Sequence, residues 1–285
     1  MTLNAMKHKP ASILPRPLEA SDAEMALFQG FFQQAIGLYL SANKKSLLTG
    51  RLAARINELE LPDLRAYHQL ITTPGEEAEQ QRAIDLITTN ETYFFRESGH
   101  FTFLAQKILP ALARHADVRI WSAASSTGEE AYSIAMLLDQ HRKTMPWHIE
   151  ASDISSRVLS YAKRGLYPLQ RGEKIPDHYL KQHCLRGSDA YEGHFLVQQQ
   201  LRDRVHFSQK NLLELPHNLG LFDVIFLRNV LIYFDPPTKV QVIQNICHHL
   251  KPGAWLFIGH AESLNGLDVN LKLKSCGPSI YQIGT

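Results

Sequence analysis

Two acidic residues follow a turn of small residues in the stretch from residue 119 to residue 138, which reads RIWSAASSTGEEAYSIAMLL. The stretch begins as a short strand pattern, continues as a small-residue turn from Ser122 to Gly128 and ends as a helical pattern. A strand, a turn of this kind and a helix N-terminus bring backbone N–H groups close to a ligand. Glu129 and Glu130 stand in the first turn of that helix, where they would repel a phosphate. The pattern therefore predicts a ligand with positive charge or hydroxyl groups and without phosphate.

S-adenosylmethionine fits this description, because it has a sulfonium, an ammonium group and ribose hydroxyls but no phosphate. The turn reads A-A-S-S-T-G and differs from the G-x-G-x-x-G fingerprint of dinucleotide-binding proteins. Asp153 ends the pattern WHIEASD, 25 residues after Gly128. An acid at the end of the second strand of such a sheet meets the ribose hydroxyls of a bound nucleoside. In the alternative interpretation, Asp153 caps the helix that starts near Ser155.

An apolar strand pattern runs directly into polar residues in FDVIFLRNVLIYF, residues 222 to 234. Arg228 and Asn229 follow the strand, so we expect them at the carboxyl edge where open parallel sheets bind ligands. Tyr233 comes shortly after them. In the alternative interpretation, Asn229 is a turn residue and Tyr233 is a core aromatic with a solvated hydroxyl.

Two further segments place polar groups beside apolar ones. ITTNETYFFRES, residues 87 to 98, offers the hydrogen-bonding residues Asn90 and Thr92 and the fixed cation Arg96. This segment either lies over a ligand as a lid or joins two domains through its aromatic residues. SQKNLLEL, residues 208 to 215, places Asn211 and Leu212 after a strand, either beside an adenine ring or as an ordinary strand exit.

Strands that alternate with helices after residue 88 must position these residues. Strand patterns occur at 118–122, 148–151, 205–208, 223–227 and 254–259, and helical patterns at 129–140, 155–164 and 237–250. This alternation predicts an α/β fold with a doubly wound, mostly parallel sheet. Lys251-Pro252-Gly253 is interpreted as the stop of the last helix, and residues 271–283 as an antiparallel edge.

The remaining chain divides into smaller units. Residues 1–18 form a proline-containing tail, and residues 19–88 form a helical domain that begins with a capping box of Ser21 and Glu24. The main domain spans residues 89–285. Within it, residues 167–203 break the alternation and are predicted to form an inserted small β-subdomain, with a strand at 194–197.

Composition excludes several functional classes. The net charge of +2 is too small to indicate a nucleic-acid partner. The three cysteines lie far apart, which suits a reducing compartment. The N-terminus lacks a signal-peptide pattern, and no stretch approaches the ~18 apolar residues of a membrane span. The fourteen histidines show no ligand spacing beside carboxylates, so no metal is expected. We therefore expect a cytoplasmic protein without membrane insertion.

Six motifs resemble the chemotaxis receptor methyltransferases of the CheR type: TTNETYFFRE, WSAASSTGEEAYSIA, ASDIS, NLLE, FLRNVLIYFD and LKPGAWLFIGHAE. The resemblance implies the fold of S-adenosylmethionine-dependent methyltransferases, with an N-terminal all-helical domain and an inserted β-subdomain. It also implies a reaction that transfers a methyl group from S-adenosylmethionine to glutamate side chains of transmembrane chemoreceptors. The products would be glutamate methyl esters, formed during chemotaxis adaptation, and S-adenosylhomocysteine.

The resemblance further implies roles for individual residues. Those expected to contact the cofactor are Asn90, Thr92, Arg96, Glu130, Asp153, Asn211, Leu212, Arg228 and Asn229. Arg96 and Tyr233 match the two residues nearest the transferred methyl group. In this family, the helical domain and the insert carry receptor recognition, so the insert at 167–203 is a candidate site for a C-terminal tether peptide of the receptor.

Three cations, Lys44, Arg51 and Arg55, fall within about 40° of one line on a helix. They lie beside an apolar stripe that contains Leu48 and Leu52. Such a row is usually a solvated helix face. The resemblance favours an electrostatic docking surface for an acidic receptor helix.

Two other functional classes remain as alternatives. A dinucleotide-dependent oxidoreductase could use a similar sheet, but the missing G-x-G-x-x-G and the paired acids disfavour it. A non-enzymatic module that only senses the cofactor or binds receptors is disfavoured because every matched cofactor position is retained.

Overall fold

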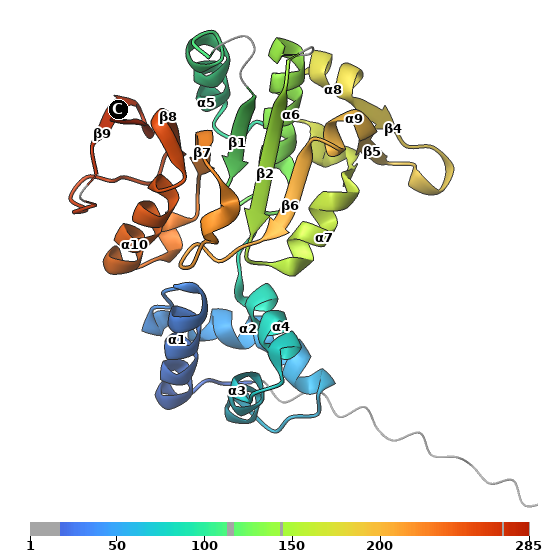
Figure 1. Cartoon of the computed structure of the whole chain (residues 1–285). Coiled ribbons are helices and arrows are strands. Elements are labelled where there is room, and N and C mark those ends of the chain that lie inside the picture. The colour runs from blue at the N-terminus through green and yellow to red at the C-terminus, as the bar shows by residue number, and fades with distance from the viewer. Residues whose placement is uncertain (1–17, 113–116, 143–144, 270, 285) are drawn as a thin grey trace, which may run out of the picture.

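The protein consists of a helical N-terminal part and an α/β C-terminal part that lie against each other (Figure 1). The computed structural model describes residues 18–112, 117–142, 145–269 and 271–284. Of the tail predicted for residues 1–18, only Leu18 lies within these ranges. No helix in the described ranges is long and apolar enough to cross a membrane.

Four α-helices form the N-terminal part: α1 Asp22–Ile36, α2 Lys45–Glu58, α3 Leu64–Thr72 and α4 Glu77–Ile87. The predicted capping box is confirmed, because the Ser21 hydroxyl accepts from the Glu24 N–H and the Glu24 carboxylate accepts from the Ser21 N–H. The helices bury a common core that includes Phe28 and Tyr67. α1 ends at Gly37, whose φ of 73° is a left-handed conformation that glycine adopts readily.

A seven-stranded sheet forms the centre of the C-terminal part, in the order β6-β2-β1-β7-β8-β10-β9. Its strands are β1 Val118–Ser122, β2 Trp147–Asp153, β6 Val205–Gln209, β7 Phe222–Leu227, β8 Leu250–Ile258, β9 Leu273–Gly277 and β10 Ile280–Ile283. The strands from β6 to β8 pair in parallel, and β10 runs antiparallel to both β8 and β9. The predicted fold class and its antiparallel edge are therefore confirmed.

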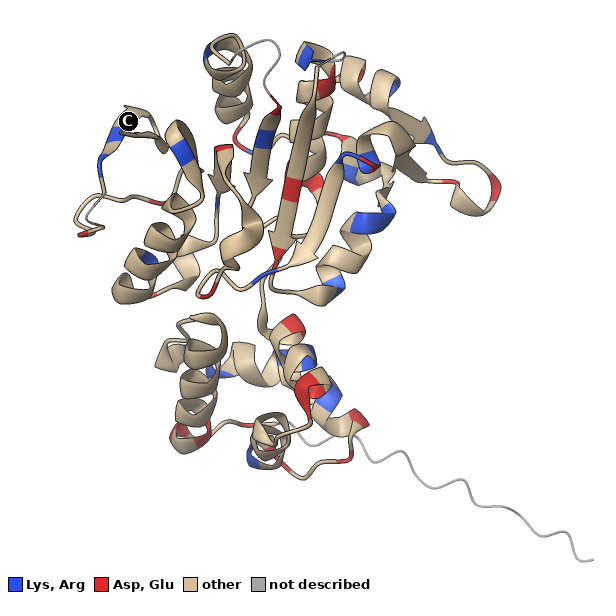
Figure 2. Ribbon diagram, in the orientation of Figure 1, with Lys and Arg blue, Asp and Glu red and all other residues tan. Residues whose placement is uncertain are grey.

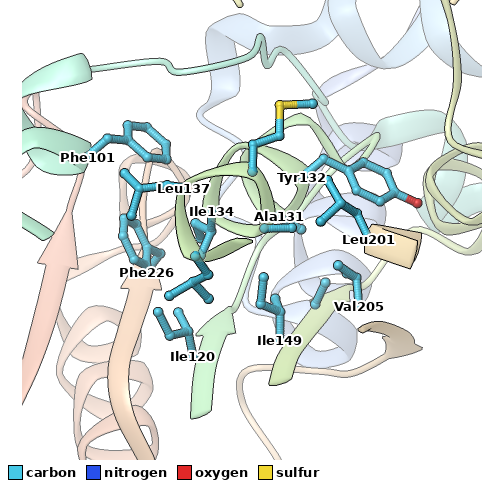
Figure 3. Packing of buried hydrophobic residues seen from close by; sticks show 14 of the residues in the cluster. Phe101, Ile120, Ala131, Tyr132, Ile134, Leu137, Ile149, Leu201, Val205 and Phe226 are labelled. Atoms are coloured by element: carbon cyan, nitrogen blue, oxygen red, sulfur yellow. The ribbon is translucent and has the colours of Figure 1, made fainter. Parts of the chain in front are cut away.

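Helices cover both faces of this sheet. They are α6 Glu129–Arg142 and α7 Ser156–Arg164 on one face, and α10 Pro236–Cys247 on the other. Successive strand residues point to opposite faces, so Ile120 packs in the core under α6 while Trp121 packs in the core under α10. Figure 3 shows Ala131 and Ile134 of α6 facing Ile120 and Ile149 of the sheet. Apolar residues on both faces fix the sheet between two helical layers.

The predicted insert is a three-stranded antiparallel sheet in the order β3-β5-β4. Its elements are β3 Leu166–Pro168, α8 Asp177–His183, β4 Cys184–Arg186, β5 His194–Val197 and α9 Gln199–Arg202. β5 occupies the residues predicted for a strand. Phe195 of β5 stacks on Tyr167 of β3, with ring centroids 5.6 Å apart, and the Tyr167 hydroxyl donates to the Thr127 carbonyl at 2.6 Å, which ties the insert to the main domain.

The interpretation of Lys251-Pro252-Gly253 as a helix stop is wrong. α10 has already ended at Cys247, and β8 begins at Leu250, so the tripeptide lies inside a strand. The register between β7 and β8 shifts between Phe222 and Val224. Such an irregularity accommodates a proline, which has no N–H for the strand ladder.

The sequence patterns also missed the helix α5, Ser98–Phe103, and several short helical turns. The turns are η1 Ala42–Lys44, the π-helical η2 Leu104–Ile108, η3 Leu169–Gly172, η4 Asp189–Tyr191, η5 His217–Leu219 and η6 Leu231–Tyr233. α5 and η2 are short, so neither produces a long apolar period in the sequence.

Candidate active site

A cavity of about 370 Å³ lies between the helical domain and the carboxyl ends of β1, β2 and β7. Its volume lies within the range of small-molecule sites. All nine residues predicted to contact the cofactor line it, and so does Tyr233: Asn90, Thr92, Arg96, Glu130, Asp153, Asn211, Leu212, Arg228 and Asn229. The structure thus brings together residues from five separate motifs.

The turn after β1 is fixed by tight packing and by Asp153. Gly128 has a φ of 95°, and a Cβ atom there would lie 2.9 Å from both the Ala162 Cβ and the Tyr167 hydroxyl. The Asp153 carboxylate accepts from the Ser126 N–H at 2.9 Å and from the Ser155 N–H at 3.0 Å. Asp153 therefore joins the turn to the segment before α7, whose N-cap is Ser155, and it also lines the cavity, where binding of the ribose stays a prediction. Burial raises the pKa of its carboxyl group.

The two acids after the turn have different roles. Glu130 lines the cavity, where one carboxylate oxygen accepts from the Ser122 hydroxyl at 2.6 Å and the other lies 3.1 Å from Arg228 Nη1. Burial raises the pKa of Glu130, although Arg228 opposes the rise. Glu129 is fully buried away from the cavity and pairs with Arg171 at 3.0 Å. Only Glu130 can therefore contact a ligand directly.

Arg228 and Asn229 emerge from β7 and are held by two carboxylates that the sequence patterns did not assign. Arg228 Nη2 lies 2.9 Å from Glu97 Oε2, and Asn229 Nδ2 donates to Glu97 Oε1 at 3.2 Å. The Asn229 backbone, with a φ of 57°, donates its N–H to Glu262 Oε2 at 2.9 Å. Glu97 and Glu262 lie inside quoted motifs, but a single acid in an irregular segment carries no periodic signal.

The segment that carries Arg96 has an unusual backbone. Phe95 and Glu97, on either side of Arg96, have φ values of 54° and 59°, which non-glycine residues rarely adopt. Arg96 Nη1 donates to the Glu91 carbonyl at 2.8 Å. Left-handed non-glycine residues cluster at functional sites, where the surrounding structure holds them in place. Arg96 therefore has a constrained position at the cavity.

The aromatic residues of this segment divide between the buried core and the cavity lining. Phe94 is fully buried, with its ring centroid 5.1 Å from that of Tyr167, so it anchors the segment to the core. Tyr93 is exposed and lines the cavity, as a lid residue would. The segment is therefore a fixed cover whose inner and outer side chains differ.

The helical domain closes the opposite side of the cavity, which the sequence patterns did not predict. Its lining side chains are Ile36, Leu38, Tyr39, Leu40, Lys44 and Leu47. The Tyr39 N–H donates to the Tyr233 carbonyl at 2.8 Å, and Asn211 Nδ2 donates to the Ala35 carbonyl at 2.8 Å. Burial raises the pKa of the Tyr233 hydroxyl. The cavity is therefore a site between two domains.

The three cations of the predicted docking row occupy different environments. Lys44 lines the cavity. Arg51 Nη1 donates to the Thr88 carbonyl at 2.7 Å, beside the segment that carries Arg96. Arg55 Nε donates to Glu79 Oε1 at 2.9 Å, and its guanidinium holds the pKa of Glu79 below its usual range. Figure 2 shows acidic as well as basic segments on the helical domain. Receptor docking stays a prediction, and Arg55 has a structural partner.

Glu97, His100 and His260 place ligand atoms within 4.8 Å of one another. The spacing of histidines and carboxylates in the sequence does not reveal this cluster, because His260 lies far along the chain from Glu97 and His100. The Glu97 oxygen nearest the imidazoles is also paired with Arg228 at 2.9 Å. Burial and the charge of Arg228 lower the pKa of His100 to about 4. A divalent cation here would face a guanidinium, which disfavours it electrostatically.

Two family descriptions match most of the chain. Residues 23–88 match "CheR methyltransferase, all-alpha domain", and residues 90–279 match "CheR methyltransferase, SAM binding domain". The chain belongs to the CheR methyltransferase family. The boundary between the two matches falls where the helices of the N-terminal part end and the segment over the cavity begins.

Curated relatives agree with this assignment. The chemotaxis protein methyltransferases of Salmonella typhimurium and Escherichia coli are 38% and 37% identical over 269 residues, which cover 93% of this chain and 92% of each relative. "Chemotaxis protein methyltransferase 2" of Pseudomonas aeruginosa is 41% identical over 249 residues, covering 86% of this chain and 87% of the relative. The resemblance carried by the six motifs is confirmed.

Among solved structures, an amino pentose methyltransferase from Micromonospora echinaspora aligns with a TM-score of 0.34 and 13% identity, over 64% of this chain and 54% of that one. An alignment this weak supports no functional argument. The CheR family match identifies an S-adenosylmethionine-binding methyltransferase domain around the cavity.

Proposed function

We propose that this CheR-family methyltransferase transfers a methyl group from S-adenosylmethionine to glutamate side chains of transmembrane chemoreceptors. The products are glutamate methyl esters and S-adenosylhomocysteine. The observation that carries this proposal is the convergence of Glu130, Asp153, Arg96 and Tyr233 on one cavity at the carboxyl edge of the sheet. Carboxylates at this edge suit a ligand with a sulfonium and ribose hydroxyls.

The proposed reaction requires no proton transfer by the protein. S-adenosylmethionine supplies a methyl group on a positively charged sulfur. The attacking glutamate has a reference pKa near ~4.3, so it is ionised at neutral pH and needs no general base. An oxygen–carbon bond forms as the sulfur–carbon bond breaks, and the two opposite charges disappear together. The protein therefore has to orient the two groups and exclude water, and good alignment alone can contribute roughly 7–11 kcal/mol.

Arg96 and Tyr233 are the residues that we assign to the reacting groups. A guanidinium next to a sulfonium would repel it, so Arg96 pairs with a carboxylate, either of the cofactor or of the target glutamate. The Tyr233 hydroxyl donates to the incoming carboxylate and orients it. A tyrosine hydroxyl is protonated at neutral pH and burial raises the pKa of Tyr233 further, so this hydroxyl can act as a donor.

Receptor recognition involves the helical domain. We assign the cytoplasmic helical region of the receptor to the surface formed by Lys44 at the end of η1 and by Arg51 and Arg55 of α2. The position of Lys44 at the cavity supports this, because a docked acidic helix would bring its glutamates to the same opening. This assignment places the enzyme in the cytoplasm.

The insert is the second assigned contact with the receptor. β4 is an edge strand that pairs with β5 on one side. Leu185 on β4 and Tyr191 nearby are exposed apolar side chains. Edge strands of this kind bind extended peptides by strand addition. A C-terminal tether peptide of the receptor fits this edge.

Incubation with methyl-labelled S-adenosylmethionine and receptor-bearing membranes tests the proposed reaction. We expect label in the receptor that alkali releases as methanol, because carboxyl methyl esters are labile to base. Receptors with the target glutamates changed to alanine serve as the matched control. Alkali-stable label, or equal label in the control, would contradict glutamate methylation.

A further inference from the structure

Glu97 has an unusual set of contacts for a residue just outside the cavity lining. Its side chain is 11% exposed. One carboxylate oxygen pairs with Arg228 at 2.9 Å, and the other accepts from Asn229 Nδ2 at 3.2 Å and from the His260 N–H at 3.1 Å. Glu97 thereby joins the Arg96 segment to the exit of β7. No role was expected for it from the motifs.

Arg228 needs such a partner, because its side chain is 1% exposed. A buried guanidinium without a counter-charge is strongly unfavourable. Arg228 has two carboxylate partners, Glu97 and Glu130. Burial acts to raise the pKa of Glu97, but Arg228 and the hydrogen bonds from His260 and Asn229 outweigh it and hold the pKa below its usual range. Burial raises the pKa of Glu130 instead. Glu97 is thus the firmer negative charge opposite Arg228.

The charge of Arg228 matters because Arg228 lines the cavity. S-adenosylmethionine and S-adenosylhomocysteine are nearly the same shape, but the first carries a positive sulfonium and the second a neutral thioether. An uncompensated guanidinium would repel the sulfonium and leave the thioether almost unaffected. Neutralising the charge of Arg228 therefore changes the affinity for the cofactor relative to the affinity for the product.

We propose that Glu97 is a specificity-determining positioning residue, which neutralises Arg228 and thereby raises the affinity of the cavity for the charged cofactor relative to that for its neutral product. The same carboxylate accepts from the Asn229 side chain and from the His260 N–H, while Arg228 donates to the Arg96 carbonyl. Glu97 acts through Arg228 and contacts neither ligand itself. The proposal rests on the proposed use of S-adenosylmethionine but not on the identity of the receptor.

Binding measurements on purified protein separate this role from a purely structural one. Calorimetry gives the dissociation constants of wild type and Glu97→Gln for S-adenosylmethionine and for S-adenosylhomocysteine. Glutamine keeps the shape of the side chain but removes its charge. We expect the affinity for the cofactor to fall about fivefold or more relative to that for the product, as a single uncompensated charge acts at an effective dielectric constant near ~20.

A matched control lies at the other end of β7. Asp223 pairs with Lys251 at 2.7 Å, and its side chain is 12% exposed, so it resembles Glu97 in burial and pairing. Asp223→Asn should leave the ratio of the two dissociation constants unchanged. Glu97→Asp, which keeps the charge, should retain the wild-type ratio even if both ligands bind more weakly.

The ratio of the dissociation constants for S-adenosylmethionine and S-adenosylhomocysteine decides whether the proposal holds. Equal weakening of both ligands in Glu97→Gln, or no weakening of either, would overturn the proposal and leave Glu97 a structural residue at most. If Glu97→Gln does not fold, Arg228→Gln decides, because loss of the guanidinium should shift the ratio toward S-adenosylmethionine, and an unchanged ratio would overturn the proposal. If the wild-type protein bound neither ligand, that result would instead refute the use of S-adenosylmethionine.

Discussion

The two walls of the cavity are built in different ways. On the sheet wall, Asp153 and Arg228 are buried and Glu130 is partly buried, and each is held by hydrogen bonds or ion pairs from other segments. On the helical wall, Leu38 and Leu40 are buried apolar residues that belong to the core of the helical domain. The sheet wall therefore offers directional recognition, while the helical wall offers shape and excludes water.

This difference indicates which wall determines ligand specificity. Hydrogen bonds to charged groups contribute about 1.5–3 kcal/mol each, and buried partners left unpaired are costly. Apolar contacts contribute in proportion to the area they cover and tolerate small changes of shape. We therefore expect substitutions on the sheet wall to change ligand affinity, and substitutions on the helical wall to change stability or turnover.

The largest effect is expected for Asp153→Ala on the sheet wall. The change removes the acceptor for the Ser126 and Ser155 N–H groups and the carboxylate assigned to the ribose hydroxyls. Loss of one charged hydrogen-bonding group of about 3 kcal/mol corresponds to roughly a hundredfold weaker binding of S-adenosylmethionine. Calorimetry with the wild type and the variant measures this change in affinity.

Asp153→Asn sharpens the same test. Asparagine keeps one acceptor oxygen but loses the charge, so its affinity should fall between those of wild type and Asp153→Ala. Thermal unfolding of each variant checks that the fold persists. Near wild-type affinity in a folded Asp153→Ala would mean that the helical wall supplies most of the binding energy.

The sheet wall was predictable from the sequence, and the helical wall was not. Asp153, Arg228 and Asn229 follow strands, and the carboxyl ends of parallel strands meet at one edge, so local patterns were sufficient. Leu38 and Leu40 are indistinguishable in sequence from ordinary core residues. Their place at the cavity depends on how the two domains pack, which no local pattern encodes.

The next largest effect is expected among the three cations of the predicted docking row, where Arg55 of α2 and Lys44 of η1 serve different surfaces. Arg55→Ala leaves the Glu79 carboxylate, 10% exposed, with the Tyr67 hydroxyl as its remaining hydrogen-bond partner. We expect the free energy of unfolding to fall by about 2–3 kcal/mol, because a partly buried charge loses its counter-ion. Urea denaturation measures the change.

Lys44→Ala is the matched control for Arg55→Ala. Lys44 lines the cavity, so its loss should lower receptor methylation while the free energy of unfolding stays within about 0.5 kcal/mol of wild type. If Lys44→Ala and Arg55→Ala changed stability equally, the division of the basic row into a structural and a functional part would be wrong.

The row also shows the limit of helical periodicity. Helical periodicity places Lys44, Arg51 and Arg55 on one face. In the structure, however, Lys44 lines the cavity, Arg51 donates to the Thr88 carbonyl and Arg55 pairs with Glu79. η1 ends at Lys44 and α2 begins at Lys45, so the helix does not carry the first cation in register with the others. Periodicity predicts a face, whereas the partners on that face depend on tertiary structure.

A smaller effect is expected where the helical wall meets α10. Gly37 has a φ of 73°, and a Cβ atom there would lie 2.8 Å from Thr238 Cγ2 and 3.1 Å from Leu213 Cδ2. Gly37→Ala should lower the free energy of unfolding by about 1–2 kcal/mol, since it adds both strain and a clash between the domains. Urea denaturation measures this change.

Gly30→Ala, in the middle of α1, should have the opposite sign. No heavy atom lies within 4 Å of a Cβ atom placed at Gly30. Alanine is favoured over glycine by up to about 1 kcal/mol inside a helix, so this variant should be more stable than wild type. Equal destabilisation by both changes would show that the contact at Gly37 does not hold the helical wall in place.

The smallest effect is expected for Tyr233→Phe, where the two walls meet. The Tyr233 ring packs against the core of the helical domain, and its backbone carbonyl accepts from the Tyr39 N–H, so phenylalanine keeps both contacts. Only the hydroxyl that we assign to the incoming glutamate is lost. We expect kcat for receptor methylation to fall about five- to tenfold, equivalent to about 1 kcal/mol, while KM for S-adenosylmethionine changes less than about twofold.

Tyr281→Phe in β10, outside the cavity lining, should leave both constants unchanged. A raised KM with an unchanged kcat would instead make Tyr233 part of the cofactor wall, and the boundary between recognition by the sheet and closure by the helices would have to be redrawn at this residue.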